Sequence, residues 1–130
     1  GLGFRVLPLV GPSSILLALA ASGLNGQQFA FVGYLPQNAA ERTTRIKQLE
    51  GVAHKNGQAQ LCIETPYRNT ALWHALLATL QASTMLALHS GLTLEAGFSR
   101  CLPVAAWRKL GQTPELDAAL KLPCIFALGQ

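Results

Sequence analysis

The chain has little charge and few of the residue patterns that mark common enzyme chemistry. Only 12% of its 130 residues are charged, against roughly 25% in typical soluble domains. Its six carboxylates form no evident pair, so glycosidase chemistry has no support. His54, His74 and His89 lie far apart, and no His-Glu-x-x-His, Gly-x-Ser-x-Gly, Walker or Gly-x-Gly-x-x-Gly pattern occurs. Zinc hydrolysis and acyl transfer are therefore unsupported.

Cysteine is also scarce. The three cysteines, Cys62, Cys101 and Cys124, are odd in number and include no Cys-x-x-Cys pair. This pattern speaks against a disulfide framework and against a zinc site, so we expect no metal. It indicates buried thiols in a reducing cytoplasm.

No apolar run is long enough to cross a membrane. The longest apolar region, residues 6–24, is interrupted by Gly-Pro-Ser-Ser at residues 11–14, and a helical span needs roughly 20 residues. No basic region or cleavage site indicates secretion. We therefore expect a cytoplasmic protein without a membrane partner. Because half of the residues are apolar, part of the surface is expected to meet another domain or subunit.

Apolar runs and turn signals predict the elements of one domain. Residues 4–10 and 29–35 read as strands, and Pro12 opens a helix that ends at Gly23. Asn38 and Glu41 have capping-box spacing and predict a helix to about Leu49. Asn56-Gly57 marks a turn before a strand over residues 59–64.

The second half combines helices with a hairpin. Thr65 and Pro66 introduce a helix over residues 67–80, with Leu72, Leu76 and Leu80 on one face. Residues 84–94 and 100–107 read as two strands around Gly97, Pro114 opens a short helix, and residues 123–128 form the closing strand. These elements predict a single α/β, three-layer-like domain with a mixed parallel and antiparallel sheet flanked by helices.

Two strand-to-helix turns are candidate ligand sites. Gly11-Pro12-Ser13-Ser14 exposes the first amides of a helix, where a ligand can approach the backbone, although such a turn with a serine cap is also common structurally. Arg68 falls in a first helical turn, which disfavours a cation. It pairs either with Glu64 or with an anionic ligand, a carboxylate or an RNA phosphate.

A basic segment follows the second strand. Arg42, Arg45 and Lys47 come after Pro36-Gln37-Asn38, and the net charge is +4. They either contact a nucleic-acid backbone or form the solvated face of an amphipathic helix. Trp73 and Trp107 lie in apolar segments and are expected in the core or an interface.

Four segments together resemble the second domain of the tetrapyrrole methylase superfamily. They are residues 8–14, the Ala-x-x-Ala-Ser-Gly-Leu pattern through Leu24, Phe-Val-Gly-Tyr-Leu-Pro at residues 31–36, and Glu-Thr-Pro-Tyr-Arg at residues 64–68. They are similar to the branch that includes the ribose methyltransferase of small-subunit ribosomal RNA. Methyl transfer needs few acids or bases, because the sulfonium donor is already activated and the protein mainly aligns it.

The resemblance implies an S-adenosylmethionine-dependent methyltransferase with the donor between two domains of a homodimer. It implies that residues 1–130 are the C-terminal domain and contribute to the donor cleft and the dimer interface. The glycine-rich donor loop then belongs to an N-terminal domain outside this chain, and the chain alone is expected to be inactive. By resemblance, the donor-contacting residues are Pro12, Ser13, Thr65, Pro66, Ser90, Gly91 and Leu128.

The acceptor is left open between an RNA and a tetrapyrrole-like molecule. Arg68, Arg42 and Arg45 are the predicted substrate-binding residues. The ribosomal branch commonly has Ser-Pro-His-Arg where this chain has Thr-Pro-Tyr-Arg at residues 65–68, so the resemblance does not fix the acceptor. The alternative function is a non-catalytic binding or dimerisation module that holds RNA. No catalytic residue is predicted.

Overall fold

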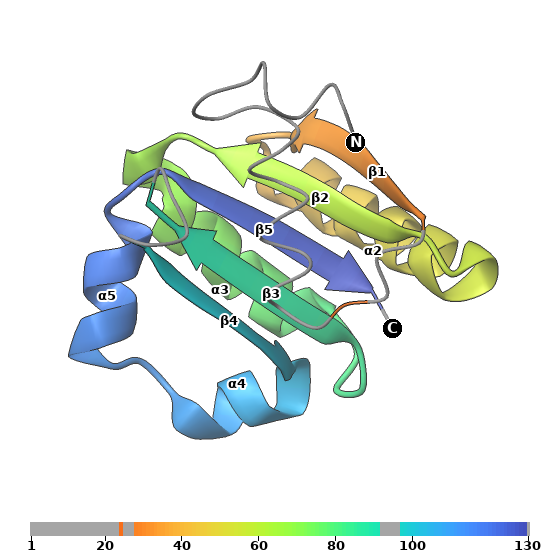
Figure 1. Cartoon of the computed structure of the whole chain (residues 1–130). Helices are drawn as coiled ribbons and strands as arrows, with labels where there is room; N and C mark the ends of the chain where they lie inside the picture. Colours follow the sequence, from red (N-terminus) through yellow and green to blue (C-terminus); the bar gives the residue numbers. More distant parts are fainter. Residues whose placement is uncertain (1–23, 25–27, 92–96, 130) are drawn as a thin grey trace, which may run out of the picture.

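A computed structural model describes Leu24, residues 28–91 and residues 97–129 (Figure 1). Its described strands form one five-stranded mixed sheet in the order β1-β2-β5-β3-β4. β1 pairs in parallel with β2, and the other three pairings are antiparallel. The strands are β1 (Phe29–Tyr34), β2 (Ala59–Glu64), β3 (Met85–Ser90), β4 (Phe98–Pro103) and β5 (Cys124–Gly129). The predicted α/β class and mixed sheet are therefore confirmed.

Helix α2 (Ala39–Asn56) begins as predicted but is longer than predicted. The Asn38 side chain accepts a hydrogen bond from the Glu41 amide at 3.0 Å, which caps the first turn. The helix continues past Leu49 because Leu49 and Ala53, one turn apart, are both buried against the core. It ends at Gly57, whose φ of 63° gives the left-handed conformation usual after a helix.

The predicted helix over residues 67–80 is divided into two segments. Pro66–Arg68 form a 3₁₀ turn, η2, and α3 (Asn69–Thr79) follows. Thr65 precedes the turn but makes no side-chain capping bond. Leu72, Leu76 and Leu80 are all buried, as their spacing predicts. The Asn69 amide fixes the junction by donating to the Leu120 and Leu122 carbonyls at 3.1 and 2.9 Å.

The predicted strand over residues 100–107 is wrong in its second half. β4 ends at Pro103, and Val104–Leu110 form helix α4. Val104 and Trp107 are buried while Arg108 and Lys109 are exposed, which is a helical rather than an alternating pattern. The predicted hairpin between β3 and β4 and the short helix α5 (Pro114–Leu120) are both present, but β3 ends at Ser90 rather than at Leu94.

One face of the sheet carries the larger part of the described core. Figure 1 shows α2 and α3 lying together on this face. Trp73 of α3 is fully buried there and meets Trp107 edge-on, with the ring centroids 4.8 Å apart. The opposite face carries small residues around Leu24, among them Ala59, Ala87 and Ala127. The predicted strand at residues 4–10 and the helix opened by Pro12 lie outside the described residues.

The topology places several chain turns at a single edge of the sheet. β1, β2 and β3 all run in the same direction, and β5 lies antiparallel between β2 and β3. The carboxyl ends of β1, β2 and β3 therefore meet the start of β5. No helix in the described ranges is long and apolar enough to cross a membrane.

Candidate functional site at the carboxyl edge of the sheet

A cavity of about 400 Å³ opens where β1, β2 and β3 end. Pockets of this size suit small ligands. Three predicted donor-binding residues, Thr65, Pro66 and Gly91, line it, and they come from two strand ends separated by β5. The other lining residues are Tyr34, Ile63, Glu64, Pro123, Cys124 and Ile125. The fold thus brings part of the predicted site together.

Glu64 shapes the turn at the mouth of this cavity. Its carboxylate accepts hydrogen bonds from the Thr65 amide at 2.8 Å and from the Thr65 hydroxyl at 3.5 Å. The Thr65 carbonyl then accepts from the Arg68 amide at 2.8 Å. Within the part of the chain that the structure describes, no ion pair joins Glu64 to Arg68. The predicted alternative of an ion pair between Glu64 and Arg68 is therefore absent here, because the Glu64 carboxylate accepts hydrogen bonds from Thr65 instead.

Arg68 pairs with its neighbouring tyrosine instead. Its guanidinium donates to the Tyr67 hydroxyl and lies 4.8 Å from the centre of the Tyr67 ring. Its Nε is buried and makes no hydrogen bond. A guanidinium has five N–H donors, so this cation retains donors for an anionic group.

Ser90 and Cys124 use their polar atoms inside the protein. The buried Ser90 hydroxyl and the Cys124 thiol both donate to the Ala119 carbonyl of α5. Burial raises the pKa of Cys124 to about 11, so the thiol is protonated at neutral pH and is not a nucleophile. Ser90 therefore anchors the end of β3 to α5, and its hydroxyl is already engaged.

Leu128 is not brought to the cavity. It pairs with Gln60 at the start of β2 and with Leu86 near the start of β3, and its side chain lies in the core. Because β5 runs antiparallel to both neighbours, its end lies at the opposite edge of the sheet from Thr65 and Gly91. Pro12 and Ser13 lie outside the described residues.

The predicted substrate-binding arginines follow two neighbouring parallel strands. Arg42 and Arg45 lie in the first two turns of α2, which begins shortly after β1, and Arg68 follows β2. Arg45 contacts Gln48 at 3.5 Å, while the Nε of Arg42 is buried and makes no hydrogen bond. The carboxyl ends of parallel strands share one edge, so all three arginines follow strands that end at the same edge of the sheet.

Sequence reasoning missed Tyr34, Ile63 and Ile125 as cavity residues. They form a row across β1, β2 and β5, since Tyr34 pairs with Ile63 and Ile63 with Ile125. Only strand register reveals such a row. A tyrosine placed two residues before Pro36, at the end of a strand, was the one available signal.

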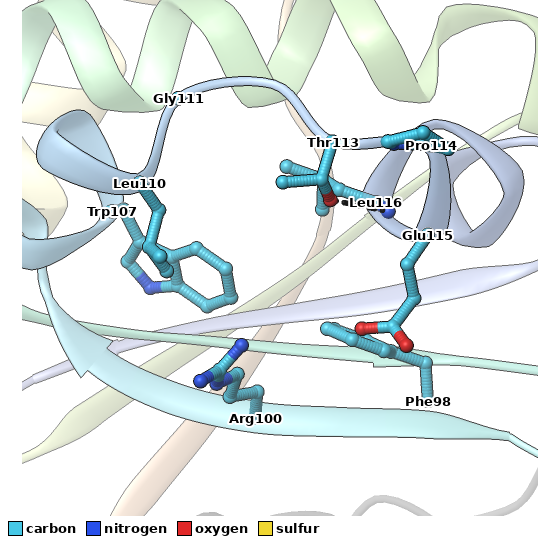
Figure 2. Close-up of a pocket in the computed structure, with 9 residues that line it drawn as sticks. All are labelled: Phe98, Arg100, Trp107, Leu110, Gly111, Thr113, Pro114, Glu115 and Leu116. Atoms are coloured by element: carbon cyan, nitrogen blue, oxygen red, sulfur yellow. Dashed lines mark hydrogen bonds between the residues drawn. The ribbon is translucent and has the colours of Figure 1, made fainter.

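A second cavity, of about 370 Å³, lies at the β4 edge (Figure 2). Arg100 points from β4 toward Trp107 and Leu110, while Glu115 reaches from α5 toward Phe98. No predicted site residue lines this cavity. Across residues 28–91 and 97–129, no group of His, Cys, Asp and Glu side chains is arranged to hold a metal ion.

A buried polar cluster joins α2 to the turn before β3. The Glu50 carboxylate accepts from the Gln81 amide at 2.7 Å and from the Thr84 hydroxyl. The Thr84 oxygen also lies 3.0 Å from Nε2 of His54. Since the threonine proton goes to Glu50, His54 acts as the donor in that contact. The sequence pattern does not indicate that Glu50 is buried, because it looks like any exposed carboxylate on a helix.

Comparison with known proteins gives partial matches. No protein-family model matches the chain. Three curated relatives, each named ribosomal RNA small subunit methyltransferase I, align with about half of it or less. The Mesorhizobium japonicum protein is 48% identical over 50 residues, covering 38% of this chain and 17% of the relative. The Pseudomonas aeruginosa protein is 34% identical over 67 residues, with coverages of 52% and 22%. The Vibrio cholerae protein is 35% identical over 68 residues, with coverages of 51% and 22%.

A solved structure matches over more of the chain. The crystal structure of the methyltransferase CobJ superposes with a TM-score of 0.51 and 18% identity, covering 89% of this chain and 47% of CobJ. The chain resembles the tetrapyrrole methylases, as its motifs predict. At this identity, CobJ supports the methylase-domain fold alone. The methylase-like chain spans about a fifth of the length of the curated relatives it matches.

Proposed function

We propose that this chain is the C-terminal half of an S-adenosylmethionine-dependent methyltransferase and that the cavity beside Thr65, Pro66 and Gly91 forms part of the donor cleft. The observation that carries the proposal is the gathering of these three residues at one 400 Å³ cavity. The relatives' names support methyl transfer as the reaction class.

The chemistry of the cavity suits a donor that needs alignment rather than activation. Ile63, Ile125 and Pro66 give it an apolar lining, and the Cys124 thiol is protonated. The Glu64 carboxylate is engaged with the Thr65 amide. An already activated methyl group requires positioning in a site that excludes water, and this lining provides such a surface.

Ribosomal RNA is the acceptor we propose. The names of the curated relatives support it, and so does the position of Arg42, Arg45 and Arg68 after two neighbouring parallel strands. A tetrapyrrole-like acceptor is the second candidate, supported by the resemblance of the sequence motifs to the tetrapyrrole methylase superfamily. Three free cysteines support a reducing, cytoplasmic setting.

Calorimetric titration of S-adenosylhomocysteine tests the donor site. We expect tight binding by the full-length protein containing this chain and weak or no binding by the 130-residue chain alone. If neither binds, the methyltransferase proposal fails, and the non-catalytic binding or dimerisation module replaces it.

Light scattering on the full-length protein tests the proposed homodimer, for which twice the protomer mass is the expected result.

A pair of matched variants locates the site. Ile125→Phe enlarges a side chain that lines the proposed donor cavity, whereas Leu110→Phe makes a similar enlargement in the second cavity. We expect Ile125→Phe to weaken S-adenosylhomocysteine binding at least tenfold and Leu110→Phe to leave it unchanged. Equal effects of the two variants would contradict the assignment of the donor to this cavity.

A further inference from the structure

Two exposed aromatic side chains of the described residues, Tyr34 and Tyr67, lie in or next to the lining of the proposed donor cavity. Three aromatic residues are more than half exposed: Phe31 at 53%, Tyr34 at 63% and Tyr67 at 77%. Two of them lie on β1, and the third lies in η2, the turn after β2. Tyr34 lines the cavity, and Tyr67 follows the lining residue Pro66. Solvent-exposed rings in one place are the usual sign of a surface that binds another molecule.

A backbone irregularity turns Tyr34 toward the cavity. Successive residues of a strand point to opposite faces, so residues three apart, such as Phe31 and Tyr34, would lie on different faces of a regular strand. The pairing of β1 with β2 shifts by one residue between Phe31 and Gly33, and Gly33 has a φ of 75°. The bulge places Tyr34 opposite Ile63, on the face where the cavity opens. Only glycine adopts such a φ without strain.

Tyr67 presents an open ring with a cation beside it. The Arg68 guanidinium lies 4.8 Å from the ring centre and donates to the phenol oxygen. The ring is nevertheless the most exposed of the three. Among the described side chains no carboxylate pairs with Arg68, and its buried Nε makes no hydrogen bond. A flat ring and an uncompensated guanidinium therefore lie side by side.

We propose that Tyr34 and Tyr67 form a stacking surface for the bases of a single-stranded RNA acceptor, with Arg68 contacting an adjacent phosphate. This inference rests on the proposed function and adds to it the residues that hold the acceptor. Unpaired bases stack on tyrosine rings, whereas bases inside a duplex have their faces covered. Arg42 and Arg45, which follow β1 at the same sheet edge, extend the positive surface for the RNA backbone.

The test is fluorescence anisotropy with a labelled single-stranded oligoribonucleotide and the full-length protein. Tyr34→Ala and Tyr67→Ala should each weaken binding about 5- to 150-fold, the range for loss of one stacked base. Tyr67→Phe keeps the ring and should bind nearly as tightly as the unmodified protein. Leu110→Ala, at an exposed apolar residue beside the second cavity, is the control and should have no effect.

The salt dependence of RNA binding distinguishes the contribution of the Arg68 cation from that of the Tyr67 ring. Arg68→Ala should reduce the slope of log affinity against log salt by about 1, while Tyr67→Ala should leave that slope unchanged. A duplex of the same sequence should bind more weakly than the single strand. Equal binding of both forms, or unchanged affinity in the two alanine variants, would overturn the proposal.

Two further measurements separate this inference from the proposed function. S-adenosylhomocysteine binding should be unchanged in Tyr67→Ala; if the unmodified protein binds this ligand but the tyrosine variants bind RNA normally, only the stacking inference fails. Competition with a free porphyrin tests whether the surface binds a tetrapyrrole rather than RNA bases. If the porphyrin displaces the oligonucleotide and loses affinity in the same variants, the surface serves a tetrapyrrole and the assignment to RNA is wrong.

Discussion

Replacing Glu50 should destabilise the chain more than replacing any exposed carboxylate. Glu50 is only 6% exposed and accepts hydrogen bonds from the Gln81 amide and the Thr84 hydroxyl. A hydrogen bond to a charged group contributes about 1.5 to 3 kcal/mol to stability. Glu50→Ala removes both bonds and leaves the Gln81 amide unpaired, while the Thr84 hydroxyl keeps its contact with His54, so we expect a loss of about 3 to 5 kcal/mol. A typical domain has a free energy of unfolding of roughly 5 to 15 kcal/mol.

The assay is equilibrium urea unfolding of Glu50→Ala, Glu50→Gln, Thr84→Val and the Glu50→Ala/Thr84→Val double variant. Glu50→Gln keeps the shape and one acceptor oxygen, so it should cost about 1 to 2 kcal/mol less than Glu50→Ala. Because Glu50 and Thr84 share a hydrogen bond, their effects should fall short of additivity by about 1 kcal/mol or more. Glu41→Ala serves as the exposed control.

The result that would refute this reasoning is a loss below about 1 kcal/mol for Glu50→Ala, together with additive effects of the two single substitutions. The cluster would then be a consequence of the packing of α2 rather than a cause of it. The slope of the unfolding free energy with urea should stay constant across the series, since the surface exposed on unfolding is the same.

Three further predictions concern titration and the core. Burial raises the pKa of Cys62 to about 12 from 9.0, so the unfolded state loses its proton first and stability should fall as pH rises from about 9 to about 12; unfolding across this range should show a weaker fall in Cys62→Ala. Burial lowers the pKa of His89 below 6.5, so stability should fall as pH drops below 6.5, and a drop of equal size in His89→Leu would contradict this. Trp107→Phe removes the indole donor to the Leu86 carbonyl, 2.7 Å away, and should cost about 1 to 3 kcal/mol in urea unfolding; a loss under about 0.5 kcal/mol would count against that bond.

Local signals predicted most of the described elements. Asn38 and Pro114 mark helix starts because each effect acts within one turn, through a side-chain cap or a fixed φ. The start of α4 was missed although Ala105 and Ala106 favour a helix, because the apolar run through Trp107 was read as a continuation of the strand before Pro103. Short apolar segments remain ambiguous until tertiary contacts form.

The site residues that lie in turns after strands were easier to predict than those whose place depends on strand direction and register. Thr65 and Pro66 follow a strand whose end the sequence predicts correctly, at Glu64. Gly91 came from the family resemblance alone, because the predicted strand ran past it to Leu94 whereas β3 ends at Ser90. Leu128 lies one residue before the end of β5, but the direction of β5 relative to β2 is set by pairing across the whole sheet. Predicting that Tyr34 lines the cavity would have required knowing that the strand has a bulge at Gly33. Direction and register are long-range properties, so one chain's local pattern does not determine them.

The hydrogen bonds and protonation of the polar groups at the cavity limit which of them can remove a proton from the methyl acceptor. Among the lining residues, Glu64 accepts from the Thr65 amide and the Cys124 thiol is protonated; Ser90, next to the lining residue Gly91, donates to the Ala119 carbonyl. A proton acceptor for a hydroxyl must have a free lone pair within hydrogen-bond reach of it. Recruiting Glu64 would therefore cost the bond that holds the turn before Arg68. The cavity is better suited to holding an activated donor in place, and removal of the acceptor proton is then a task for solvent or for residues outside its described lining.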